Sequence, residues 1–152
     1  IFMGCNISSN KKNYILIKKT KENTNKISFK DQIIKAKVVH VYDGDTIHVV
    51  FNALGDYYKW NCRIYGIDTP ELRTKNNLEK EKGYKIKKIV FDNFLNKIVD
   101  IKCYDFDKYG RLLIDIFLLP EIDNPKNHNM LSEWMVDNKY AHSYFGRTKK
   151  KW

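Results

Sequence analysis

Three carboxylates, Asp45, Asp68 and Glu71, lie in short polar loops that follow apolar segments. These loops, residues 43–46 and 68–71, contain no Cys or His. Hard carboxylate oxygens suit Ca²⁺, which accepts oxygen ligands in loose geometry, better than they suit Zn²⁺. Pro70 disfavours helical backbone at Thr69, so the Thr69 carbonyl can turn toward the same cavity as a neutral ligand. These residue types predict a calcium site.

Two arginines could bind a phosphate group beside that site. Arg63 precedes Asp68 by five residues, and Arg111 follows the turn Asp107-Lys108-Tyr109-Gly110. A guanidinium group offers two parallel N–H donors that match two phosphate oxygens. Two such groups facing a metal form an electrophilic clamp for a phosphodiester, whose transition state gains negative charge. Taken singly, each loop also fits an ordinary turn, and each arginine an ordinary surface ion pair.

Five strands and two helices are expected to position these loops. Two β-rich runs around Asp43-Gly44 predict a hairpin, and apolar residues spaced by three and four predict a long helix. The expected strands are residues 33–42, 46–51, 57–67, 97–104 and 111–119, and the expected helices are residues 76–96 and 129–138. This order predicts a mainly β, α+β fold: a five-stranded OB-fold β-barrel with an inserted helix and a short C-terminal helix.

Charge divides the chain of 152 residues, whose formal net charge is +10. Residues 1–30 hold seven Lys against one Glu, without hydrophobic periodicity, which predicts a flexible basic arm. Residues 31–152 then form the folded domain. The excess of positive charge favours a polyanionic partner, either nucleic acid or an anionic surface. Three scattered cysteines are too few for a disulfide framework, and Cys62 and Cys103 fit buried strand positions.

The three polar loops together resemble the signature blocks of the staphylococcal nuclease (thermonuclease) family. The blocks are Val41-Tyr42-Asp43-Gly44-Asp45-Thr46, Arg63 with Asp68-Thr69-Pro70-Glu71, and Asp107-Lys108-Tyr109-Gly110-Arg111. They occur in the order of that family and near its spacing. The resemblance covers about residues 33–147, which is most of the expected domain.

The resemblance implies a role for each acidic residue. Asp45 and Asp68 would ligate Ca²⁺ directly, with the Thr69 carbonyl as a third ligand. Asp43 would support the metal loop through contacts to those ligands. Glu71 would hold and polarise the attacking water, as a general base or as an orienting group.

The resemblance also implies how substrate is held. Arg63 would bind the scissile phosphate, and Arg111 would stabilise the pentacoordinate phosphate and assist departure of the 5′ oxygen. An arginine pKa above about 12 makes Arg111 a poor proton donor, so this assistance is expected to be electrostatic. Lys108 and Tyr109 would lie near the nucleotide phosphates.

The implied activity is Ca²⁺-dependent endonuclease cleavage of DNA and RNA at the 5′ P–O bond, leaving 3′-phosphates. We expect a monomer. One alternative is a non-catalytic nucleic-acid-binding module that keeps the barrel, although such modules usually lose the carboxylates or arginines that are present here. Another is a lipid-anchored basic adaptor in which the arm is the functional part.

The sequence departs from the family pattern toward its end. The family's type member continues into a third helix, whereas this sequence ends in a basic run and Trp152, which we expect to fold back and cover part of the barrel. The aromatic pair that stacks on the base does not align cleanly. Tyr144 and Phe145 are the expected substitutes, because exposed aromatic rings can stack on any base; packing against the barrel is the alternative.

The first residues suggest attachment to a membrane. Phe2-Met3-Gly4-Cys5 resembles a bacterial lipoprotein cleavage box, with residues upstream of Ile1 and lipid on Cys5, which predicts export to the cell envelope or secretion. A start at Met3 instead fits N-myristoylation of Gly4, with Cys5 available for palmitate, and predicts the cytoplasmic face of a membrane. An accidental match in a short segment is the third interpretation.

Overall fold

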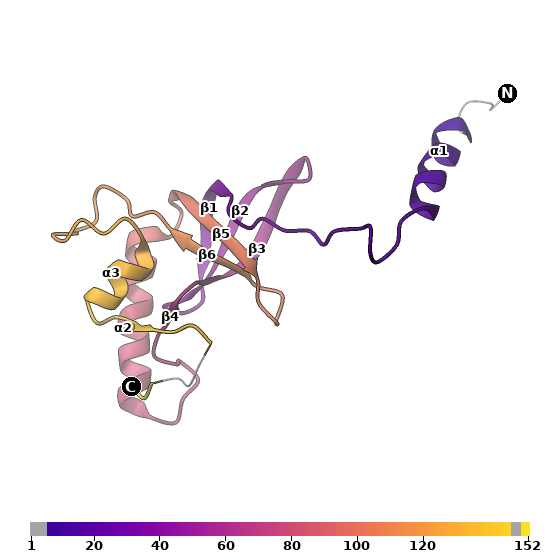
Figure 1. The fold of residues 1–152 in the computed structure, drawn as a ribbon. Helices are drawn as coiled ribbons and strands as arrows, with labels where there is room; N and C mark the ends of the chain where they lie inside the picture. Colours follow the sequence, from indigo (N-terminus) through magenta and orange to yellow (C-terminus); the bar gives the residue numbers. More distant parts are fainter. Residues whose placement is uncertain (1–5, 147–149) are drawn as a thin grey trace.

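A computed structural model describes residues 6–146 and 150–152, and within them five strands close a barrel. Around the barrel the order is β1-β2-β3-β6-β5, and the pairing of β5 with β1 closes it (Figure 1). The strands are β1 (Ile33–Val41), β2 (Thr46–Ala53), β3 (Asp56–Ile64), β5 (Ile98–Phe106) and β6 (Leu112–Ile116). The predicted OB-fold barrel of α+β class is therefore confirmed.

Alternating apolar residues explain why these strands close around one core. In β5, Val99, Ile101 and Cys103 are buried while Ile98 is exposed. Since side chains along a strand point to opposite faces, this alternation gives the barrel one apolar inner face. Cys62 and Cys103 lie in this core as expected, and burial raises the pKa of the Cys103 thiol to about 11.

The pairing of β3 with β6 is parallel, whereas the other barrel pairs are antiparallel. In this register Cys62 lies opposite Leu112, and Arg63 lies opposite Leu113. Arg111, which directly precedes Leu112, is thus brought beside the strand that carries Arg63. This pairing joins two of the three polar loops.

The predicted third strand, residues 57–67, is wrong at its end, because β3 stops at Ile64. Gly66 has a φ of +79°, which turns the chain before the short strand β4 (Ile67–Asp68). An L residue with a side chain rarely adopts that φ, so glycine permits the break. β4 pairs with β7 (His142–Ser143), an element the sequence analysis did not predict.

Two helices pack beside the barrel. Helix α2 (Asn77–Phe94) begins after Asn76, whose side chain accepts hydrogen bonds from the backbone N–H groups of residues 78 and 79, and it packs against β1. Helix α3 (Leu131–Asp137) is fixed to β6 by Asp115, whose carboxylate accepts hydrogen bonds from the backbone N–H and the hydroxyl of Ser132. Both predicted helices are confirmed, each a residue or two shorter at its ends.

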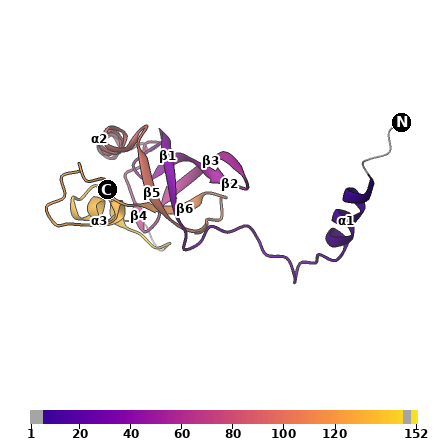
Figure 2. The same ribbon diagram turned by 90° about the horizontal axis from the view of Figure 1, so that it is seen from above.

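The N-terminal arm contains a helix that the sequence analysis did not predict, α1 (Asn6–Ile17). It stands clear of the barrel and is joined to it by an extended segment (Figures 1 and 2). Phe29, assigned from sequence to the arm, is buried and packs edge-on to Phe51 and Trp60, with ring centroids 5.4 and 5.0 Å apart. Among the described residues, no helix has both the length and the apolarity required to cross a bilayer.

Trp152 folds back onto the domain, but its ring contact is with β7 and not with the barrel that it was predicted to cover. Its ring stacks on His142 of β7, with centroids 3.9 Å apart and planes at 19°. The C-terminal residue therefore lies against the small sheet that follows the break in β3.

Candidate active site

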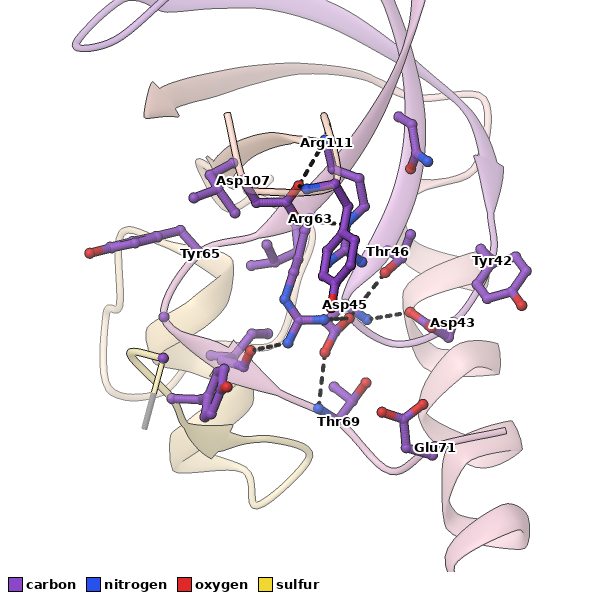
Figure 3. A pocket seen from close by; sticks show the side chains of 18 of the residues that line it. Tyr42, Asp43, Asp45, Thr46, Arg63, Tyr65, Thr69, Glu71, Asp107 and Arg111 are labelled. Carbon is purple, nitrogen blue, oxygen red and sulfur yellow. Dashed lines mark hydrogen bonds and ion pairs between the residues drawn. The ribbon is translucent and has the colours of Figure 1, made fainter. Parts of the chain in front are cut away.

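One pocket of about 930 Å³ collects residues from all three polar loops. It lies at the end of the barrel where β1, β3 and β5 end (Figure 3). Among its lining residues are most of the side chains predicted from sequence, namely Asp43, Asp45, Arg63, Thr69, Glu71, Lys108, Tyr109, Arg111, Tyr144 and Phe145. Among the predicted metal and catalytic residues, Asp68 alone does not line the pocket; it is buried, with 3% of its surface exposed.

Hydrogen bonds and close packing fix the loop between β1 and β2. The Asp43 carboxylate accepts a hydrogen bond from the backbone N–H of Asp45 at 3.1 Å. Gly44 lies so close to its neighbours that a Cβ atom there would come within 2.7 Å of Ile86 in helix α2 and 2.9 Å of Thr69. Glycine is therefore required for the loop to pack against both elements. Asp43 supports the position of Asp45, as expected from sequence.

A buried ion-pair network joins the first loop to the second. Arg63 donates from Nη1 to Asp45 Oδ1 at 2.8 Å and from Nη2 to Asp68 Oδ1 at 3.3 Å. Arg63 Nη2 also donates to the Ile67 carbonyl at 3.0 Å, and the Thr69 backbone N–H donates to Asp45 Oδ2 at 3.1 Å (Figure 3). Carboxylates separated by 23 positions in the chain thus share one guanidinium group.

Burial is the main influence on the ionisation of Asp45. It raises the pKa of Asp45 to about 7; Arg63 and the hydrogen bond from Thr69 act to lower the pKa, while Asp43 and Asp68 act to raise it further. A positive charge bound beside Asp45 would favour its ionised form.

The donor set decides which cation the site suits. Asp45 and Asp68 offer oxygen atoms, with the Thr69 carbonyl as the predicted neutral ligand. Across residues 6–146 and 150–152, no group of three or more His, Cys, Asp or Glu side chains is close enough to hold a metal ion. Two carboxylates, a carbonyl and water fit the oxygen-rich coordination of Ca²⁺ and would make a poor zinc site.

Arg111 is held in the third loop by Asp107. The Asp107 carboxylate accepts hydrogen bonds from Arg111 Nε at 2.7 Å and from the Arg111 backbone N–H at 2.9 Å. The ring of Tyr109 lies beneath the same guanidinium group, 5.6 Å from its central carbon. Burial alone would raise the pKa of Asp107, but hydrogen bonds from Arg111 and Tyr109 bring it below its ordinary value.

Glu71 and the predicted substrate-binding residues lie at the rim of the pocket. The Glu71 side chain is exposed and directed toward the pocket beside Thr69 (Figure 3). Tyr109 is 73% exposed and Phe145 67% exposed, whereas Tyr144 is half-buried. These side chains can contact a bound ligand without rearrangement of the core.

Several residues of this pocket were missed by reasoning from sequence. Asp107 belongs to a predicted turn and to the third signature block but received no role, although an aspartate four residues before an arginine is a signal for such a pair. Tyr65 lines the pocket and meets Phe145 edge-on, with ring centroids 5.7 Å apart. Its position in an apolar strand segment gave no signal of this, because the break at Gly66 was not predicted.

The sequence profile described as staphylococcal nuclease homologue matches residues 61–151, from β3 through the second and third polar loops. The chain belongs to the staphylococcal nuclease homologue family. The matched range begins after the Asp43–Thr46 loop, which the pocket nevertheless joins to it. The chain thus carries a nuclease-type or nucleic-acid-binding module.

A relative is found in the archaeon Methanocaldococcus jannaschii, where the protein is described as uncharacterised. It is 34% identical over an alignment of 135 residues, and the match covers 76% of this chain and 61% of that protein. The chain therefore spans less than two thirds of the length of this relative. Family membership therefore establishes the fold and the general class of this module, but not the reaction that it catalyses.

Proposed function

We propose that this chain is a Ca²⁺-dependent endonuclease that hydrolyses phosphodiester bonds of DNA and RNA at the 5′ P–O bond and leaves 3′-phosphates. The observation that carries the proposal is the common pocket of Asp45, Arg63, Glu71 and Arg111. Non-catalytic modules of this kind usually lose the carboxylates or arginines that this pocket retains. The family membership supports the same class of reaction.

Asp45 and Asp68 would hold Ca²⁺ together with the Thr69 carbonyl, and Asp43 would keep Asp45 in place. The bound ion would act as a Lewis acid that offsets the negative charge developing on the phosphate oxygens. Arg63 already bridges the two aspartates. It would thereby keep one guanidinium group beside the ion and the phosphate.

The remaining residues would divide the work of hydrolysis. Glu71 would accept a proton from water as the water oxygen bonds to phosphorus. Arg63 and Arg111 would bind the phosphate oxygens, which carry more negative charge in the pentacoordinate transition state than in the substrate. The bond from phosphorus to the 5′ oxygen then breaks, and this oxygen takes its proton from solvent, because an arginine is too weak an acid.

Plasmid nicking tests this proposal. The wild-type protein should convert supercoiled plasmid to open circles and cleave single-stranded RNA with Ca²⁺, and a chelator should stop both reactions. Glu71→Gln and Asp45→Ala should each lower turnover by several decades, since each removes a group that acts in the transition state. Glu81→Gln, an exposed glutamate of helix α2, is the matched control and should leave turnover unchanged.

End-group analysis tests the position of cleavage. The products should carry a 3′-phosphate, seen as a requirement for phosphatase treatment before a polymerase can extend them. Tight binding of nucleic acid by wild-type protein without any turnover in Ca²⁺ would instead identify the non-catalytic module. Full activity of Glu71→Gln would end the assignment of Glu71.

A further inference from the structure

Two histidines lie side by side on the outer face of the barrel. His40 of β1 is directly opposite His48 of β2 in the antiparallel register, and their ring centroids are 5.0 Å apart with planes at 44°. His40 is exposed and His48 is half-buried. We call these two residues the histidine pair. Neither of them has a role in the proposed hydrolysis.

An irregularity in β1 puts His40 on this face. Ala36 and Val38 are buried in the core, so strict alternation would direct His40 inward as well. The register shifts between Val38 and His40, and Val41 is then the next buried residue. Bulges of this kind redirect side chains and are common beside active sites. The bulge therefore turns His40 outward, where it meets His48.

The separation of the two rings fits coordination of one metal ion by both. Zinc–nitrogen bonds are about 2.0–2.1 Å long, so two imidazoles on one tetrahedral ion have ring centroids about 5 Å apart. The histidine pair already has this spacing. Water can fill the remaining positions, because one ring is exposed and the other half-buried. Asn61, which is exposed and opposite His48 in β3, also offers an amide oxygen.

The chemistry of imidazole decides which ions the pair suits. Neutral imidazole binds Zn²⁺, Cu²⁺ and Ni²⁺, whereas Ca²⁺ prefers oxygen ligands. Burial, together with the charges of His40 and Lys59, holds the pKa of His48 below its ordinary value, which favours the neutral form that binds metal. Lys59 opposes a bound cation, but this side chain is exposed, so its ammonium group can move into solvent.

We propose that His40 and His48 bind one divalent transition-metal ion, of the class of Zn²⁺ and Cu²⁺. His48 lines the same pocket as Asp45 and Arg63, so the ion adds positive charge at the rim of the candidate active site. Its open coordination positions accept a phosphate oxygen of nucleic acid. This last step rests on the proposed function, whereas the metal site itself does not.

Calorimetric titration with Zn²⁺ tests the site without reference to turnover. The parent is the untagged full chain with Cys5→Ser, which removes a thiol that could bind the same ions, and excess Ca²⁺ is present to occupy the carboxylates. The parent should bind one equivalent. His40→Gln and His48→Gln should each weaken binding about tenfold or more, because even the partners of a metal ligand contribute that much. His142→Gln, which removes a histidine outside the pair, is the matched control and should bind as the parent does.

Spectroscopy and melting identify the ligands. With one equivalent of Cu²⁺, the electron paramagnetic resonance spectrum of the parent should show hyperfine coupling to two imidazole nitrogens, and that of His40→Gln to one. Saturating Zn²⁺ should raise the melting temperature of the parent, because an ion that binds the folded state stabilises it. This rise should vanish in His40→Gln. The two proteins should melt together in chelator, since His40 is exposed.

Steady-state kinetics tests the position of the ion at the rim. On single-stranded DNA in excess Ca²⁺, saturating Zn²⁺ should lower the KM of the parent about twofold or more, because added positive charge raises the local concentration of a polyanion. The KM of His40→Gln should not change, and kcat should stay the same in both proteins. If the parent cleaves no DNA, the proposed function fails, and the titration still decides the metal site.

Any of three results would overturn the metal site. They are the absence of Zn²⁺ binding by the parent in excess Ca²⁺, parental affinity in both His40→Gln and His48→Gln, and an equal loss of affinity in His142→Gln. An unchanged KM in the parent with Zn²⁺ bound would overturn the contact between the ion and a phosphate.

Discussion

Asp107 holds Arg111 at two points, because its carboxylate accepts one hydrogen bond from the guanidinium Nε of Arg111 and another from the backbone N–H of Arg111. The pair is mostly shielded, with 23% of the Arg111 side chain and 14% of the Asp107 side chain exposed. Because the two bonds fix both ends of the arginine, its guanidinium group is oriented before substrate arrives. Such preorganisation lowers the cost of binding a transition state.

Removing this support should impair turnover more than stability. In Asp107→Ala, Arg111 gains freedom, and we expect kcat on single-stranded DNA to fall about 10- to 100-fold, as for other misplacements of a catalytic group. Steady-state kinetics measures the change. Asp105→Ala, which removes an exposed carboxylate near the end of β5, is the control. An unchanged kcat in Asp107→Ala would show that Arg111 needs no such partner.

Gly44→Ala should disturb the first loop through crowding. The added Cβ would overlap Ile86 and Thr69, so we expect a loss of about 1 to 3 kcal/mol in the free energy of unfolding, measured by urea denaturation. Ile86→Ala in the same background removes one of the clashing groups. The double variant should therefore lose less than the sum of the two single variants, and strict additivity would contradict the clash.

Asp115 should make stability depend on pH. Burial raises its pKa to about 6, against hydrogen bonds from Ser132 and Ile116 that lower it. Because the unfolded chain ionises near the ordinary value of 3.8, the folded state loses stability through this group as pH rises from about 4 to 6. Relative to Asp115→Asn, wild-type protein should lose about 2 to 3 kcal/mol between pH 4 and pH 7. Urea denaturation at both pH values measures it, with the exposed Asp123→Asn as control.

The buried ring of Phe29 marks the start of the folded domain, one residue inside the arm that was defined by charge. Deleting residues 1–28 should leave the melting temperature and the turnover of small substrates unchanged, since Phe29 remains in place. Phe29→Ala in that shortened chain should lose about 3 kcal/mol, the usual cost of removing a buried phenyl group. Calorimetry tests both statements. A large loss on deletion alone would mean that the arm supports the fold.

Attachment to lipid remains a prediction, because Gly4 and Cys5 lie outside the described residues. Detergent phase partitioning of the protein made in its native cell, followed by mass spectrometry of the N-terminal peptide, tests it. Cys5→Ser should move the protein to the aqueous phase if Cys5 carries the anchor of an exported lipoprotein. Gly4→Ala should do so only if Gly4 is myristoylated, and no shift in either variant identifies an accidental motif.

Local patterns sufficed for the barrel and for the loops that carry polar residues. Alternation of apolar residues predicted β5, and Asp-Gly predicted the hairpin between β1 and β2, because both signals act between neighbours in sequence. The break at Gly66 was not predictable in the same way. The short strand β4 that follows this break pairs with β7, about 76 positions later in the chain.

The candidate site shows the same division. Residue types and spacing made Asp45, Arg63 and Arg111 candidates, and the order of the three loops, which resembles a known family, gave them roles. The contribution of Tyr65 could not be predicted, because an aromatic residue in a strand is usually part of a core. Its exposure follows from the turn of the chain at residue 66.

The parallel contact between β3 and β6 has a consequence during synthesis. The strands are separated by almost fifty positions, and such distant contacts form late because they must close a large loop. A nascent polypeptide that ends before Leu112 lacks the strand that brings Arg111 beside Arg63. Most of this chain must therefore leave the ribosome before the two arginines meet.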